Sequence, residues 1–139
     1  MDGAPNPSNG RPRTLGLHHV NLVVADVNRA RRFYESALGL EFADEEFEIT
    51  FLTTPGTGDS LALQRSGGEL DRLSGKVRSP GEMGGVDHIG FAVKQGTIDE
   101  LVTAVEAAGG SVLMRFANDA GEATKVFVAD LDGYVLQLG

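Results

Sequence analysis

The pattern of apolar and polar residues repeats in the two halves of the chain. Alternating apolar positions predict a strand over residues 17–24 and another over residues 86–93, and each carries one histidine, His19 and His88. A helical pattern and then three short strand patterns follow each of them. The order strand, helix and three strands therefore occurs twice.

Apolar residues spaced by three and four positions predict a helix after each opening strand. The first helix, over residues 30–38, follows Asp26, whose carboxylate can cap free amides, and it precedes Gly39, which suits a left-handed C-cap. For the second helix, Thr97 and Glu100 have the spacing of a capping box. Both helices are predicted to place one apolar face on a sheet.

The other strands are short. They are predicted at residues 40–43, 47–53, 60–65, 111–116, 124–129 and 133–138, with a hairpin turn at Asp132-Gly133. Each half closes on a strand with one glutamine, Gln64 and Gln137. Because side chains alternate along a strand, we expect His19, Gln64, His88 and Gln137 to share the sheet face that the helices do not cover.

Alternation also sorts their neighbours. His18 is predicted to point to the opposite face, in a structural role, and Asp87 is not expected to be a partner of His88. Two histidines at equivalent positions favour a shared pocket over two separately buried rings, whereas ordinary strand polarity explains the two glutamines equally well. The sequence thus predicts a pseudo-symmetric pocket.

Composition sets the domain boundaries. We interpret residues 1–14, with three of the five prolines and no apolar run, as a flexible tail that is neither a signal peptide nor a membrane anchor. Residues 15–139 form one domain of two modules, about 15–65 and 86–139. Residues 66–85, rich in glycine and serine, are either a loop over the site or a linker.

Charge and cysteine content limit the function. With 12 Lys plus Arg and 20 Asp plus Glu the formal net charge is -8, which disfavours nucleic acid as a partner. Without cysteine, any bound metal depends on nitrogen and oxygen ligands. We expect a cytoplasmic protein that binds a small molecule and does not interact with a membrane.

Several motifs together resemble the vicinal oxygen chelate superfamily, which includes glyoxalase I, bleomycin-resistance proteins and type I extradiol dioxygenases. They are the two histidine-bearing openings, Arg32-Phe33-Tyr34 followed by Leu38-Gly39, and the closing segment 130–137. The resemblance implies an α+β fold, in which two βαβββ modules form a cup-shaped mixed sheet with helices on the outer face. It also implies a divalent metal (Fe, Mn, Ni or Zn) that binds vicinal oxygens of a substrate.

The resemblance assigns metal-ligand positions to His19, Gln64, His88 and Gln137. Ala62 is the other candidate for the position of Gln64. Relatives usually have Glu where this chain has Gln137, and an amide lacks the negative charge that attracts a dication and cannot act as a general base. The expected pocket also includes Asn21, Ala62, Gly90 and Val135. Glu48 is the most available base if its strand turns it into the cup.

Three functions follow from these expectations. The leading hypothesis is an enzyme of lyase, isomerase, thiol-transfer or dioxygenase type, in which the metal polarises adjacent substrate oxygens. Its rival is a metal-free protein that binds a drug or natural product, as in bleomycin-type antibiotic resistance, and the missing carboxylate favours it. A third is an interaction module without an active site. Because a cup-shaped sheet leaves edge strands open, we also predict a homodimer.

Overall fold

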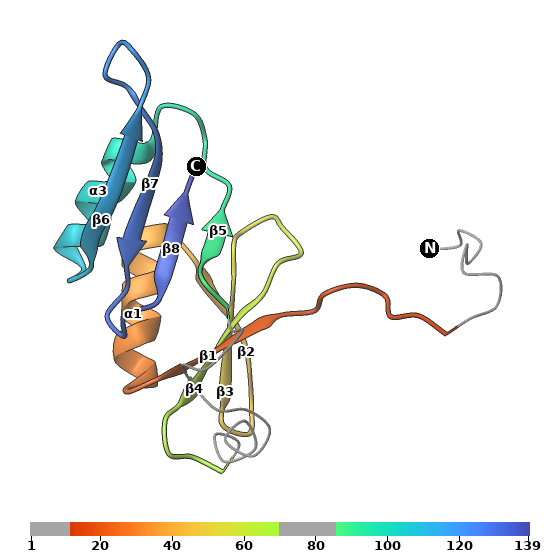
Figure 1. The fold of residues 1–139 in the computed structure, drawn as a ribbon. Helices are drawn as coiled ribbons and strands as arrows, with labels where there is room; N and C mark the ends of the chain where they lie inside the picture. Colours follow the sequence, from red (N-terminus) through yellow and green to blue (C-terminus); the bar gives the residue numbers. More distant parts are fainter. Residues whose placement is uncertain (1–11, 70–85) are drawn as a thin grey trace.

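The computed structural model describes residues 12–69 and 86–139, arranged as two sheets and two helices (Figure 1). The first half contains β1 (Val20–Val24), α1 (Val27–Leu38), β2 (Glu41–Glu46), β3 (Ile49–Thr53) and β4 (Leu61–Arg65). The second half contains β5 (Ile89–Phe91), α3 (Ile98–Ala107), β6 (Ser111–Ala117), β7 (Ala123–Ala129) and β8 (Val135–Leu138). The predicted order of elements is confirmed in both halves. Residues 1–11 of the predicted tail and 70–85 of the predicted loop lie outside the described residues.

Both sheets have the same mixed topology. The strand orders are β1-β4-β3-β2 and β5-β8-β7-β6, and in each sheet the opening strand is parallel to the closing strand while the other pairs are antiparallel. The opening and closing strands of each module are therefore neighbours. This topology confirms the predicted α+β fold of two βαβββ modules.

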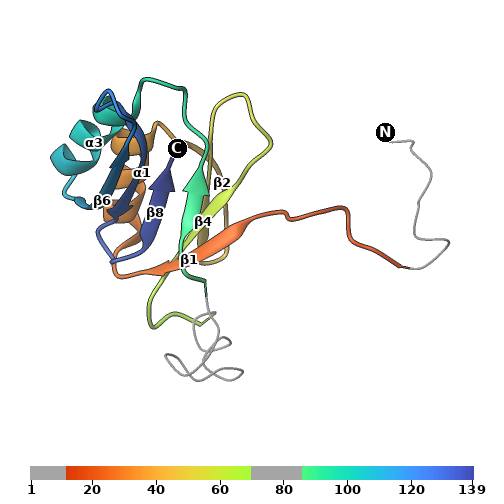
Figure 2. The ribbon, with the colours of Figure 1, turned by 45° about the horizontal axis from the view of Figure 1, so that its top comes forward.

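One hydrophobic core joins the two modules. Buried residues of β1 and β4 belong to the same cluster as buried residues of β7 and β8, and Leu63, Val128, Leu136 and Leu138 are all fully buried. Helices α1 and α3 contact each other within this core (Figures 1 and 2). The helix-facing sides of both sheets are thus buried together, and their opposite sides face away from this core.

The caps of the helices were predicted correctly in one case and wrongly in the other. Asp26 accepts a hydrogen bond from the amide of Arg29, and Gly39 ends α1 with a φ of 74°. At α3 the capping box is wrong, because the Thr97 hydroxyl donates to the carbonyl of Lys94 instead of accepting from the helix. Asp99 and Glu100 lie in the first turn of α3, where negatively charged carboxylates interact favourably with the positive end of the helix dipole.

A buried hydrogen bond fastens the second module to the first helix. The Tyr34 hydroxyl, fully buried on α1, donates to Oδ2 of Asp130, which is 6% exposed. Oδ1 of Asp130 accepts from the amides of Asp132 and Tyr134, and Asp132 in turn accepts from the amide of Ala25. The turn between β7 and β8 is therefore held against the end of β1. Phe33 and Tyr34 were predicted to be core residues, and both are.

This buried carboxyl group predicts a dependence of stability on pH. Burial raises the pKa of Asp130, although the Tyr34 hydroxyl and two backbone amides oppose the shift. The folded protein then holds this proton at pH values where the unfolded chain, with a pKa of about 3.9, has released it. The contribution of Asp130 to the free energy of unfolding should thus fall as pH rises from about 3.9 through the raised pKa.

Asp130→Asn should remove this contribution, because the amide can accept from the same backbone groups and donate to Tyr34 but cannot ionise. The check is urea denaturation of both proteins at a series of pH values around this interval. If the free energy of unfolding changes with pH in the same way in both proteins, Asp130 is not the source of this pH dependence.

Candidate functional site

The outward face of the first sheet presents a group of polar and aromatic side chains, which we call the N-terminal half-site. It consists of His19, Asn21, Phe51 and Gln64. The Asn21 amide donates to Oε1 of Gln64 over 2.8 Å, and the His19 ring packs edge-on against Phe51 with centroids 5.1 Å apart. Gln64 is 4% exposed, so its orientation is fixed by both burial and the bond from Asn21.

Strand register explains why these residues meet. Asn21 of β1 pairs with Ala62 of β4, and Ala62 pairs with Phe51 of β3, so these three positions form one row across the sheet. Ala62, the alternative to Gln64, is fully buried in that row and has no polar side chain. Gln64 thus contributes the amide group of β4 to this face.

The outward face of the second sheet carries an equivalent group, the C-terminal half-site, formed by His88, Phe127 and Gln137. The His88 ring packs edge-on against Phe127 at 5.2 Å. Gln137 pairs with Phe127 of β7 and with Gly90 of β5, and its amide donates to the carbonyl of Gly139 over 3.0 Å. A Cβ atom at Gly90 would meet nothing within 4 Å, so the surface beside Gln137 is open.

Two expectations about the residues beside these histidines need correction. Asp87 is a partner of His88, because its Oδ2 lies 2.7 Å from Nδ1 of the ring. His18, expected to point away from His19, has its Nδ1 2.8 Å from Nδ1 of that ring. The reason is the same in both cases: β1 begins at Val20 and β5 at Ile89, so strand alternation does not govern the residues that precede them.

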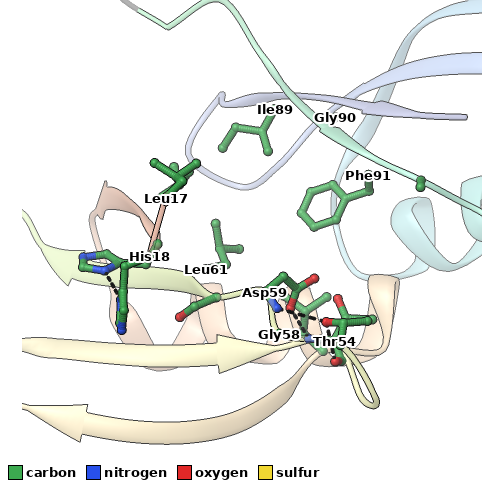
Figure 3. A pocket seen from close by; sticks show the side chains of 15 residues that line it. Leu17, His18, Thr54, Gly58, Asp59, Leu61, Ile89, Gly90 and Phe91 are labelled. Carbon is green, nitrogen blue, oxygen red and sulfur yellow. Dashed lines mark hydrogen bonds between the residues drawn. The ribbon is translucent and has the colours of Figure 1, made fainter. Parts of the chain in front are cut away.

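A hollow of about 370 Å³ lies between the first sheet and β5 (Figure 3). Its walls are largely apolar, with Leu17 and Leu61 on one side and Ile89 and Phe91 on the other. His18, His19 and Gly90 also line it, as does the turn at residues 54–60. In that turn Asp59 accepts from the amide and hydroxyl groups of nearby threonines, which lower the pKa of its carboxyl group against the opposing effect of burial. Of the residues expected in the pocket, His19 and Gly90 line this hollow and the others do not, because the hollow arises where the modules meet.

Glu48, the residue named as the most available base, lies at the turn between β2 and β3. Its Oε1 is 3.7 Å from the Arg65 guanidinium and accepts a hydrogen bond from the amide of Glu69. Its carboxylate also fills the space where a Cβ at Gly68 would lie. Glu48 thus supports residues 65–69, and a role as a base stays a prediction.

Among the described residues, the two half-sites of one chain are separate groups. No hydrogen bond or ring contact within residues 12–69 and 86–139 joins a member of one half-site to a member of the other. The same residues contain no group of three histidine, aspartate or glutamate side chains that could hold a metal ion. Val135, predicted to lie in the pocket, is half-buried beside Ala129 on β7.

The sequence analysis did not predict the aromatic members of the two half-sites. Phe51 and Phe127 lie within predicted strands, and the alternation of those strands could have placed them on the outward face.

We also find no helix in the described part of the chain with the length and apolar character needed to span a membrane.

Comparison with known proteins identifies the family. The family model for the Glyoxalase/Bleomycin resistance protein/Dioxygenase superfamily matches residues 16–138, so the chain belongs to this superfamily. Among curated proteins, none matches the chain.

Solved structures with the same fold have low sequence identity. A variant of the fosfomycin resistance protein FosX from Listeria monocytogenes, complexed with Mn(II) and 1S,2S-dihydroxypropylphosphonic acid, is 20% identical, with 91% of this chain and 90% of that one covered and a TM-score of 0.65. A hypothetical protein, SA1046, from S. aureus is 21% identical, with 91% and 94% covered and a TM-score of 0.69. A glyoxalase-related enzyme from Fulvimarina pelagi is 22% identical, with 90% and 87% covered and a TM-score of 0.62. At these identities the likeness concerns the fold.

Proposed function

We propose that the protein is a metal-dependent enzyme that acts on a small molecule with vicinal oxygen atoms, which one metal ion can bind together. The observation that carries the proposal is the pair of half-sites, each of which presents one histidine and one glutamine on the outward face of its sheet. Imidazole nitrogens and amide oxygens are ligands that Mn, Fe, Ni and Zn accept, so this donor set fits a divalent metal. When bound, the metal would act as a Lewis acid toward the oxygens of the substrate.

The chain's own residues would prepare this site. His19 and His88 would supply the two nitrogen ligands, and the edge-on contacts with Phe51 and Phe127 restrict the rotation of both rings. The bond from Asn21 fixes Gln64, and the bond to the carbonyl of Gly139 fixes the amide of Gln137. In the assembled site the phenyl rings would also reduce the access of water, which would strengthen charge interactions there.

A homodimer would complete the site. Both half-sites lie on the sides of the sheets that face away from the shared core, and no hydrogen bond or ring contact among the described residues joins them within one chain. We propose that the N-terminal half-site of one copy faces the C-terminal half-site of a second copy. Two-fold symmetry would then form two equivalent sites per dimer.

One observation favours a metal-free binding protein as the second candidate. Oε1 of Gln64 already accepts the hydrogen bond from Asn21. Neither half-site has a carboxylate among its proposed ligands, and the nearby carboxylate of Asp87 is already bonded to Nδ1 of His88. In that case the phenyl rings and amides would bind an organic ligand directly.

Titration of the chelator-treated protein with Mn(II), followed by calorimetry, separates the two candidates. The enzyme proposal predicts saturation at one Mn(II) per chain, and the binding proposal predicts no uptake. Because FosX is a fosfomycin resistance protein, fosfomycin is the first substrate to assay with the loaded protein. If Mn(II) fails to bind, and Fe(II), Ni(II) and Zn(II) fail as well, the enzyme proposal is refuted.

A further inference from the structure

A lysine lies on the same outward face as the C-terminal half-site. Lys125 is on β7, two positions before Phe127, so both side chains leave the strand on the side opposite the fully buried Val126 and Val128. Phe116 of β6 pairs with Lys125 in the register of the sheet. The half-site therefore continues toward β6.

The ammonium group of Lys125 is held by aromatic rings and not by acidic groups. Its Nζ lies 4.8 Å from the centroid of Phe116 and 5.9 Å from that of Phe127, and these two rings are 6.1 Å apart. Within residues 12–69 and 86–139, no carboxylate forms an ion pair with Lys125 and no group accepts a hydrogen bond from it. A cation over phenyl faces keeps its charge and its donors for another partner.

Arg115, on the other side of the same sheet, provides a contrast. It pairs with Val126, which faces the core, and its guanidinium contacts Asp99 of α3 and the carbonyl of Gly121. The positive charge on the helix side is therefore matched by a carboxylate. The positive charge on the side of the half-site is not matched among the described residues.

These contacts define a continuous surface with a charge at one end. The His88 ring touches Phe127, Phe127 and Phe116 touch each other, and Lys125 lies over both phenyl rings. Phe116 is 40% exposed, so an apolar ligand can reach it. With a net charge of -8, the protein as a whole repels anions, and a bound anion therefore requires a local cation.

We propose that Lys125 recognises an anionic group of the ligand, while Phe116 and Phe127 pack against its apolar body. The ligand class is a small organic acid whose carboxylate, sulfonate or phosphonate lies at the end of the surface away from His88. This inference rests on the proposed function, since it assigns the ligand to the C-terminal half-site, and it specifies the charge of that ligand.

The test compares two probes of the same shape, 1-naphthylacetate and its neutral amide, by fluorescence titration of the chelator-treated dialysed protein. Wild-type protein should prefer the anion by about tenfold, a typical effect of a charge-assisted bond at a partly exposed site. Lys125→Met should remove the preference and leave affinity for the amide unchanged. Lys94→Met, at an exposed position after β5, is the matched control and should keep the preference.

Parallel measurements distinguish failure of this inference from failure of the metal proposal. Mn(II) uptake by Lys125→Met should equal that of the wild type, because Lys125 is not a ligand. Mn(II) uptake without any preference for the anion would overturn the role of Lys125 and leave the metal proposal intact. A preference for the anion without Mn(II) uptake would refute the metal proposal and leave the role of Lys125 intact. If Lys125→Met instead changes the oligomeric state in light scattering, Lys125 itself contacts the second copy, and its proposed role in recognising an anionic ligand is wrong.

Discussion

Replacing His88 with alanine is expected to abolish stoichiometric binding of Mn(II). In the proposed site His88 supplies one of only two imidazole nitrogens, and the remaining donors include neutral amides that bind a dication weakly. Loss of a group that merely supports a ligand typically costs 10–100-fold in metal affinity, so loss of a ligand should cost at least about a hundredfold. Calorimetric titration with Mn(II) measures this directly.

The fold should survive the His88→Ala substitution. His88 precedes β5 and contributes to the outward face rather than to the core, so the thermal transition should shift little. Lys94→Ala is the control, because Lys94 is exposed just after β5 and lies outside both half-sites, and this variant should retain one Mn(II) per chain. Unfolding of His88→Ala would make this histidine a structural residue, and unchanged binding would exclude it as a ligand.

Gln137→Glu is expected to raise Mn(II) affinity by about tenfold or more, since it provides an anionic oxygen of nearly the same size at the closing strand. Binding to the folded state alone stabilises that state by mass action, so the melting temperature of the variant should rise with Mn(II) concentration more steeply than that of the wild type. Melting curves with and without Mn, Ni, Zn and Fe(II) provide the measurement.

A metal-free binding protein would give a different result for the same substitution. The new carboxylate would then lie beside Phe127 without a cation, and burial would raise its pKa or reduce stability. Gln137→Met, which keeps the length of the side chain but has no carboxylate, is the control for packing. A Gln137→Glu variant that is destabilised and insensitive to every metal would leave the binding protein as the better account.

The repeat in the sequence was sufficient to predict the fold. Apolar residues recur at every second position in a strand and at every third or fourth position in a helix. Backbone geometry sets both spacings and is the same in every strand and helix. These spacings located all the described strands and helices to within a few residues and placed Gln64 with Asn21, and Gln137 with Gly90, on shared faces.

Local patterns could not predict features that depend on strand ends or on contacts between modules. The partners of His18 and His88 were misjudged because β1 and β5 begin later than the apolar pattern does. The hollow beside β5 and the bond between Tyr34 and Asp130 join residues from different modules, and no periodic signal records such a distance. The aromatic contacts of Lys125 likewise depend on the register of β6 with β7.

The central claim is that each metal site combines the N-terminal half-site of one chain with the C-terminal half-site of another. Mixing His19→Ala with His88→Ala tests it most directly, because each variant alone lacks one imidazole at every site. If subunits exchange freely, mixed dimers contain one intact site, and Mn(II) binding should return to about a quarter of the wild-type capacity. No binding in a mixture that mass spectrometry shows to contain mixed dimers would contradict the shared site.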